Sequence, residues 1–197
     1  MSHDDAPTAR RVDALVAQLE DRGITSDAEL TAIVERFLAG AGPQNGARLV
    51  ARAWRDPAFK ALLLDDANAA IDAVGLETGH WVSVKLVAVE NTADVHNVIV
   101  CTLCSCYPLA LLGPSPYWYK SEAYRSRVVR EPRAVLAEFG LRLEPHVEVR
   151  VWDSTAELRY LVVPQRPAGT EGLDEDALAA LVSRDALIGV AVATAPG

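Results

Sequence analysis

The stretch VHNVIVCTLCSC, residues 95–106, runs a β-rich segment directly into three cysteines. Residues 95–100 are rich in valine and isoleucine, which predicts a strand. The cysteines follow at positions 101, 104 and 106, in the spacing C-x-x-C-x-C. The sequence therefore predicts a strand that leads straight into a thiol-rich loop.

These three cysteines are all that the chain has, and they lie within six residues. An odd number of cysteines does not fit a disulfide framework. The polar, acidic start at residues 1–5 shows no secretory signal, so a cytoplasmic location is predicted. Thiols at this density in a reducing compartment favour metal ligands over scattered core residues.

Other uses of the cluster compete with a metal site of three thiolates. A structural zinc site usually has four protein ligands, and the fourth here would be His96 on the predicted strand. Iron–sulfur clusters normally need four cysteines. A redox pair would stand at the start of a helix, which the third cysteine and Pro108 fit poorly. A cluster without metal in the core is a further alternative.

A tight chelate is the interpretation that uses all three thiols. The sulfurs of Cys104 and Cys106 and the peptide nitrogens of Ser105 and Cys106 can bind one metal ion in a plane. Cys101 can then bind from one axial side, which leaves the sixth position for water or substrate. Anionic thiolate and amide donors favour low-spin Co(III) or Fe(III) over Zn(II) or Mg(II). The spacing alone leaves the alternatives open.

Helical patterns precede this region. Apolar residues at 12, 15, 16 and 19 form one helix face, and Gly23 ends that helix. Ser26 and Glu29 form a capping-box pattern for a second helix. Residues 1–80 are thus predicted to form a helical N-terminal arm, covered by an obligate partner or by the chain's own C-terminal domain. Its further predicted helices span 47–54, start at Asp56-Pro57, and span 66–74 up to Gly75.

The pattern changes near Trp81 to strands and short helices. The fold class is predicted as α+β, in which the arm precedes a layered α/β domain over residues 81–197 that carries the metal loop. Besides 95–100, the predicted elements are strands over 82–88, 147–152, 158–163 and 187–192, of which 147–152 and 158–163 form a hairpin, and helices that open at Ser115-Pro116 and Glu131-Pro132 and span 174–182.

Charge excludes some partners. The net charge of the 197-residue chain is −8. A protein without a basic stripe has little means of binding nucleic acid, and an acidic one is repelled by an anionic membrane. We therefore expect neither partner.

Several segments besides the cysteine loop carry a resemblance to a known family. The run VCTLCSCYP at 100–108 is similar to the metal-binding signature of nitrile hydratase α subunits. Six further segments extend the resemblance over most of the chain, so the sequence resembles this family as a whole. They are residues 46–48, 90–97, 118–121, 124–133, 151–153 and 166–172, and the similarity continues to 188–190.

The resemblance implies a non-corrin cobalt ion, Co(III), with Fe(III) as the alternative, because Thr102 is the residue of cobalt members where iron members tend to carry serine. Metal ligands would be Cys101, Cys104, Ser105 and Cys106, with Cys104 oxidised to sulfinate and Cys106 to sulfenate. A β-type partner subunit, in one chain or two, would supply arginines that hold those oxygens. An activator protein, or metallochaperone, would load the cobalt.

The implied reaction is hydration of a nitrile to its amide, with Cys104 and Cys106 as catalytic residues. The metal could polarise the nitrile or acidify a water molecule, and the Cys106 oxygen could be nucleophile or base. Asp153 and Glu157 are candidates for residues that hold the metal ligands in place or contact another subunit. The alternative is that both are solvated residues of a turn. The basic stretch from Arg125 to Arg133 is expected to pair with another subunit.

Leu109 and Trp118 are candidate substrate-pocket residues. The family commonly has tryptophan where Leu109 stands, so the pocket should accept a bulky heteroaromatic or nucleoside nitrile such as toyocamycin, unless a partner side chain refills the space. The alternative function is a thiocyanate hydrolase γ-type subunit, which converts thiocyanate to carbonyl sulfide and ammonia. A non-catalytic metal-binding module is a third possibility.

Overall fold

A computed structural model describes residues 6–76, 84–104 and 106–195. The chain separates into two compact units, Met1–Gly40 and Ala41–Gly197. Within the helical region expected over residues 1–80, the helices after Gly40 belong to the second unit, together with the strands. The start of the first expected strand, at Trp81 and Val82, lies outside the described residues.

The first unit consists of helices α1 (Ala6–Asp21) and α2 (Asp27–Gly40). The predicted capping box is confirmed, since the Glu29 carboxylate accepts from the Ser26 amide at 2.9 Å and the Ser26 hydroxyl accepts from the Glu29 amide at 3.2 Å. Neither helix buries a residue. Apolar side chains such as Val12 and Val34 are more than half exposed. This unit therefore has no core of its own.

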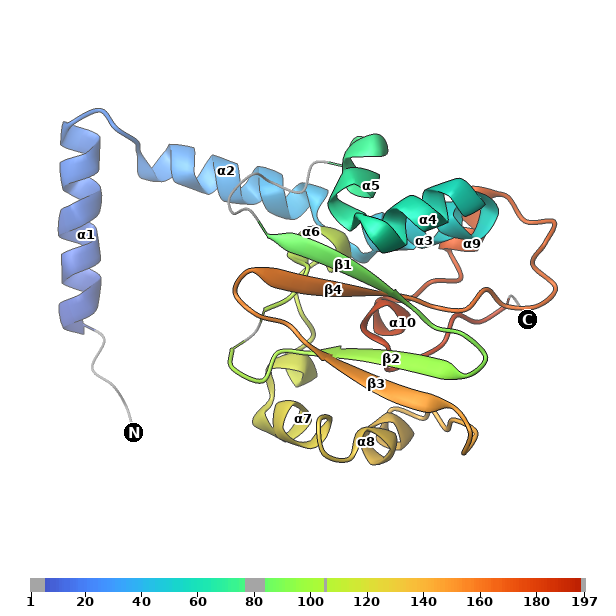
Figure 1. The fold of residues 1–197 in the computed structure, drawn as a ribbon. Coiled ribbons are helices and arrows are strands. Elements are labelled where there is room, and N and C mark those ends of the chain that lie inside the picture. The colour runs from blue at the N-terminus through green and yellow to red at the C-terminus, as the bar shows by residue number, and fades with distance from the viewer. Residues whose placement is uncertain (1–5, 77–83, 105, 196–197) are drawn as a thin grey trace. The chain divides into compact units, whose positions relative to one another are not determined.

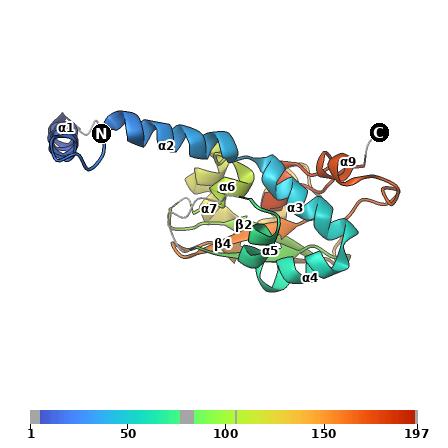
Figure 2. The same cartoon turned by 90° about the horizontal axis from the view of Figure 1, so that it is seen from above.

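Three helices open the second unit: α3 (Pro43–Arg55), α4 (Pro57–Asp65) and α5 (Ala67–Ala73). The Asp56 side chain caps α4 by accepting from the amides of Ala58 and Phe59, which confirms the predicted start. Asp66 caps α5 in the same way. Helices α4 and α5 pack against strand β1 (Lys85–Glu90), on the side of the unit seen from above in Figure 2.

The strands form two parallel pairs (Figure 1). Strand β1 pairs with β4 (Leu158–Val163), and β2 (Val95–Val100) pairs with β3 (Glu148–Asp153). Strands β2 and β4 are in contact, so the pairs lie next to each other. Fully buried side chains such as Leu63, Val98 and Leu161 make one continuous apolar core around them.

The hairpin predicted for β3 and β4 is wrong. Each strand pairs in parallel with an earlier strand, so the chain changes sheets between Asp153 and Leu158. Strand β4 ends in three buried residues, Leu161–Val163, whereas no residue of β3 is fully buried. Pairing with β1 lets β4 bury this apolar end in the core, and burial outweighs the short connection that favours a hairpin.

The final strand predicted over residues 187–192 is also wrong, because helix α10 (Arg184–Ile188) covers its first part. The Ser183 hydroxyl caps α10 by accepting from the Ala186 amide at 3.1 Å. Gly189 ends the helix with a φ of +93°, and a side chain there would collide with Asn97 of β2. Local capping therefore decided against the β-branched pattern.

Short helices make up the remaining elements. The single helix predicted from Ser115-Pro116 is two elements, since the Ser121 hydroxyl caps a new start after the 3₁₀ helix η1. In the described part of the chain, no helix is long and apolar enough to cross a membrane. The short helices are α6 (Leu109–Leu112), η1 (Tyr117–Lys120), α7 (Glu122–Arg127), α8 (Pro132–Glu138) and α9 (Glu175–Ala179). Helix α8 packs on β3.

Candidate metal centre

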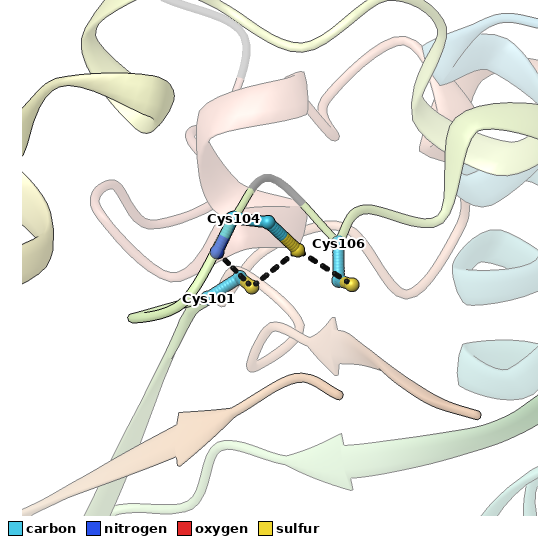
Figure 3. A group of neighbouring side chains, drawn as sticks. All are labelled: Cys101, Cys104 and Cys106. Atoms are coloured by element: carbon cyan, nitrogen blue, oxygen red, sulfur yellow. Dashed lines mark hydrogen bonds between the residues drawn. The ribbon is translucent and has the colours of Figure 1, made fainter. Parts of the chain in front are cut away.

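The three cysteine sulfurs converge at the carboxyl end of β2 (Figure 3). All three lie within 4.8 Å of one another. The Cys104 sulfur is 3.5 Å from that of Cys101 and 3.3 Å from that of Cys106. Cys101 is buried, Cys106 is 9% exposed and Cys104 is exposed. The predicted cluster is therefore formed, and it is open on the side of Cys104.

The spacing of these sulfurs suits one first-row metal ion. Two sulfurs bound at right angles, at roughly 2.3 Å from the metal, lie roughly 3.3 Å apart, whereas tetrahedral ligands lie roughly 3.8 Å apart. The observed 3.3 and 3.5 Å are nearer the first value. These two neighbouring pairs of sulfurs are therefore close enough to share one ion, and all three sulfurs lie within 4.8 Å of one another.

Asp153 anchors the start of the cysteine loop. Its carboxylate accepts from the Thr102 amide at 2.9 Å and from the Thr102 hydroxyl at 2.6 Å. The parallel register aligns Asp153, the last residue of β3, with Val100, the last of β2. Carboxyl ends of paired parallel strands meet at one edge, which explains why residues 51 positions apart touch.

Two buried tyrosines hold the backbone on either side of the cysteines. Tyr119 donates to the Cys106 carbonyl at 3.0 Å, and Tyr124 donates to the Ile99 carbonyl at 2.7 Å. Burial raises the pKa of both phenols well above the usual value, so each remains a donor. The sequence did not single out these hydrogen bonds, and both phenols lie far from the loop in the chain.

Arg125 also contacts the loop, from helix α7. Its Nη1 donates to the Cys104 carbonyl at 3.1 Å and more weakly to the Thr102 carbonyl at 3.5 Å. Three arginines of the basic stretch, which is expected to pair with another subunit, have partners within their own chain. Arg127 pairs with two glutamates of its own chain, and Arg133 donates to carbonyls of residues 143–147. Partners within the fold already use these cations.

The thiol of Cys106 is held in its neutral form by its surroundings. Burial, and then the hydrogen bond with Cys104, raise the pKa of Cys106 to about 12, although the Arg159 cation lowers it. A metal ion bound beside the sulfur is the kind of charge that removes such a proton. Binding of a metal here is therefore coupled to proton release.

His96 does not belong to the metal centre. It lies at the start of β2, buried, and both ring nitrogens are engaged. Its Nε2 bonds the Gly189 carbonyl at 2.7 Å, and its Nδ1 faces the Asn91 amide at 3.2 Å. A carbonyl only accepts, so Nε2 carries a proton. Burial lowers the pKa of His96, despite the opposing bond to Gly189. A fourth zinc ligand from His96 is excluded by these bonds.

The other candidate residues differ in position. Ser105 lies outside the described residues. The Trp118 ring packs edge-on against Tyr124 and Phe139. Leu109 starts α6, and its amide bonds the Tyr107 carbonyl at 2.8 Å. Glu157 is exposed, and its backbone amide and carbonyl form hydrogen bonds with Thr155 and Lys85.

A cavity of about 440 Å³ opens elsewhere in the second unit. It is lined by residues at the ends of β1 and β4, among them Glu90 and Arg166, and by the loop that enters β2. The cysteines follow the opposite end of β2, which is about 20 Å long for its six residues. This cavity is therefore separate from the thiol cluster.

Three thiols gathered on one loop, at the ends of two parallel strands, give this α+β protein a cluster that can hold a metal ion. A family model described as "Nitrile hydratase, alpha chain" matches residues 6–191. The chain therefore belongs to the nitrile hydratase α-chain family, whose named members are enzyme subunits.

Individual relatives agree with this assignment. The chain is 54% identical over 188 residues to the α subunit of a low-molecular weight cobalt-containing nitrile hydratase of Rhodococcus rhodochrous, covering 95% of this chain and 90% of that one. It is 49% identical over 163 residues to the γ subunit of thiocyanate hydrolase of Thiobacillus thioparus, covering 77% and 66%. A double-mutant Fe-type nitrile hydratase of Comamonas testosteroni Ni1 matches with a TM-score of 0.84 and 44% identity, covering 98% and 94%.

Proposed function

We propose that this chain is the α subunit of a cobalt nitrile hydratase, which adds water to a nitrile to form the amide. In this reaction the nitrile carbon gains a bond to oxygen, and its nitrogen ends with the two hydrogens of the water. The observation that carries the proposal is the convergence of the three sulfurs within 4.8 Å on a loop fixed by its neighbours. The cobalt-containing relatives add to it.

The ligands of the metal would be Cys101, Cys104 and Cys106, with the peptide nitrogens of Ser105 and Cys106. Thr102 favours Co(III), and Fe(III) is the alternative, because a structural neighbour is Fe-type. When bound in this set, the ion supplies a Lewis acid for the nitrile. Asp153, Tyr119 and Tyr124 would keep the donors in place, since each holds the backbone beside them.

Oxidation would complete the site. Molecular oxygen would convert the Cys104 sulfur to a sulfinate and the Cys106 sulfur to a sulfenate, in four-electron and two-electron steps. The Cys106 oxygen would then either attack the nitrile carbon or take a proton from the attacking water. Cys106 is nearly buried, but it lies beside the exposed Cys104. This arrangement supports a reaction at the open side of the loop.

A β-type partner subunit, in one chain or two, would cover the open side. The Leu103 side chain at the loop is 87% exposed, and Tyr117 is 92% exposed. Large apolar residues left so open are typical of a surface that another chain buries. The first unit, which buries no residue in α1 or α2, supports the same conclusion. Cobalt would be loaded by an activator protein.

The substrate would be a bulky nitrile, because Leu109 stands where the family commonly has tryptophan. Leu109→Trp should then lower kcat/KM for a heteroaromatic nucleoside nitrile by roughly 10-fold or more through overlap, and leave acetonitrile unchanged or improved. Specificity constants for both nitriles, measured on both proteins, test this. A wild type that already prefers acetonitrile would contradict the wide pocket.

Thiocyanate hydrolysis is the second candidate, since the γ subunit of thiocyanate hydrolase is 49% identical. The cobalt-containing nitrile hydratase relative shares more identity and covers more of the chain. Release of carbonyl sulfide and ammonia from thiocyanate, without amide formation from nitriles, would decide for the alternative.

The decisive experiment is coexpression of the chain with its β-type partner and activator, followed by elemental analysis, intact mass and assay. We expect cobalt, a total mass increase of about 48 Da for the three added oxygen atoms, and hydration that the isolated chain lacks. Zinc alone in an active complex, or full activity of the isolated chain, would refute the proposal.

A further inference from the structure

We propose that Arg125 is a positioning residue of the metal loop, which fixes the main chain at Cys104 through the Cys104 carbonyl oxygen. This inference rests on the proposed function. The Cys104 sulfur is one of the proposed metal ligands, and it lies beside the sulfurs of Cys101 and Cys106. Because the Cys104 side chain and carbonyl group share one Cα atom, a bond that fixes the carbonyl also limits where the sulfur can point.

The geometry ties one cation to two carbonyls of the loop. Nη1 of Arg125 donates to Cys104 O at 3.1 Å and reaches Thr102 O at 3.5 Å. On the other side of Thr102, the Asp153 carboxylate accepts from its amide and hydroxyl. Thr102 is thus held between the Asp153 anion of β3 and the Arg125 cation of α7. This arrangement leaves the start of the loop little freedom to turn.

Electrostatics point the same way. Three thiolates and two deprotonated peptide nitrogens carry more negative charge than a trivalent ion neutralises. A guanidinium that contacts the loop offsets part of this excess negative charge. Arg159 is the other cation whose charge acts on the cluster, through Cys106. Arg125 is hydrogen-bonded to the carbonyl of Cys104, which is itself a proposed ligand.

A further sign is that Arg125 is not placed for stability alone. Its Nε is buried and has no hydrogen-bond partner among the described residues. A buried donor without an acceptor destabilises a fold. Arg127, two residues along the same helix, instead pairs fully at the surface with Glu131 and Glu138. The two arginines therefore form a matched pair for experiment.

The test compares the coexpressed complex carrying wild-type chain, Arg125→Gln, Arg125→Lys and Arg127→Gln. Cobalt per complex is measured after dialysis against a chelator, and the sulfur-to-cobalt charge-transfer band is recorded. We expect Arg125→Gln to retain roughly 10-fold less cobalt, or more, and to shift the band. Arg125→Lys should recover part of both, because it keeps the charge but lacks the rigid fork. Arg127→Gln should match the wild type.

The outcomes separate this inference from the function beneath it. Wild-type cobalt content and an unshifted band in both Arg125 variants would overturn the role of Arg125 and leave the proposed function standing. A wild-type complex that holds neither cobalt nor iron would overturn both. If Arg125→Gln fails to fold, Arg125→Lys carries the test, since it keeps the buried stem and the charge, and an unshifted band there would count against the inference.

Discussion

The two ends of strand β2 use polar residues in opposite ways. At the amino end, Asn91, His96 and Asn97 are buried and bond to one another and to nearby backbone. At the carboxyl end, Asp153 and Arg125 bond the backbone of the cysteine loop and leave the sulfurs facing each other.

The difference separates structure from chemistry. Buried polar groups that satisfy each other stabilise a fold and have no bonding capacity left for a ligand. Side chains that fix a backbone instead present other groups to a ligand. Changes at the amino end should therefore lower stability and spare the metal, and changes at the carboxyl end should do the reverse.

The largest expected effect follows from Cys104→Ala and Cys106→Ala. Each removes a proposed metal ligand together with the oxygen it would carry, so hydration by the coexpressed complex should be abolished. The free energy of unfolding of the metal-free chain should change by no more than about 1 kcal/mol, because neither side chain anchors the core. Activity of either variant above a tenth of the wild type would contradict the ligand assignment.

A smaller effect is expected for Asp153→Asn. The neutral asparagine side chain has only one acceptor oxygen, so it cannot replace both bonds from Thr102. The loop should therefore hold the metal less well, with a loss of roughly 10–100-fold in metal affinity or activity. Glu157→Gln is the matched control, four residues on, and its exposed carboxylate should matter far less. Metal titration of the two coexpressed complexes decides, and equal losses would place both carboxylates at the site.

At the other end of β2, Asn91→Ala should cost stability without loss of metal. The side-chain oxygen Oδ1 of Asn91 accepts from the backbone amide of Asn97 at 2.7 Å, and the side-chain nitrogen Nδ2 of Asn91 faces Nδ1 of His96. Removing it leaves buried groups unpaired, at about 2–4 kcal/mol in the free energy of unfolding. Denaturant unfolding and elemental analysis measure the two. A stable variant that has lost its metal would reverse the comparison.

The smallest effect concerns pH. Burial lowers the pKa of His96 below its ordinary 6.5, so the unfolded chain binds its proton first as the pH falls. Neutral His96 makes its full contribution to the free energy of unfolding above pH 6.5. This contribution declines as the pH falls from 6.5 toward the lowered pKa, by no more than about 1.4 kcal/mol per pH unit. Denaturant unfolding at about pH 7 and about pH 5.5 tests it. His146→Gln, at an exposed position, should keep this slope, and a slope of zero in the wild type would exclude His96.

Local features of the sequence predicted much of the fold. The caps at Ser26 and Asp56 were readable because each involves residues at most three apart. The strand at 95–100 and the cysteine spacing were readable for the same reason. The final strand failed where the Ser183 cap and Gly189 outweighed a β-branched pattern. One predicted helix was split by the cap at Ser121.

The sequence by itself predicted the thiol cluster, because its three cysteines lie within six residues. It also identified the family, because similar motifs run over most of the chain. Only the tertiary structure decided what holds the loop. Parallel pairing of β2 with β3 brings Asp153 to Thr102, and α7 brings Arg125 to Cys104. Strand pairing is chosen by which apolar faces the whole chain can bury, and no local pattern carries that information.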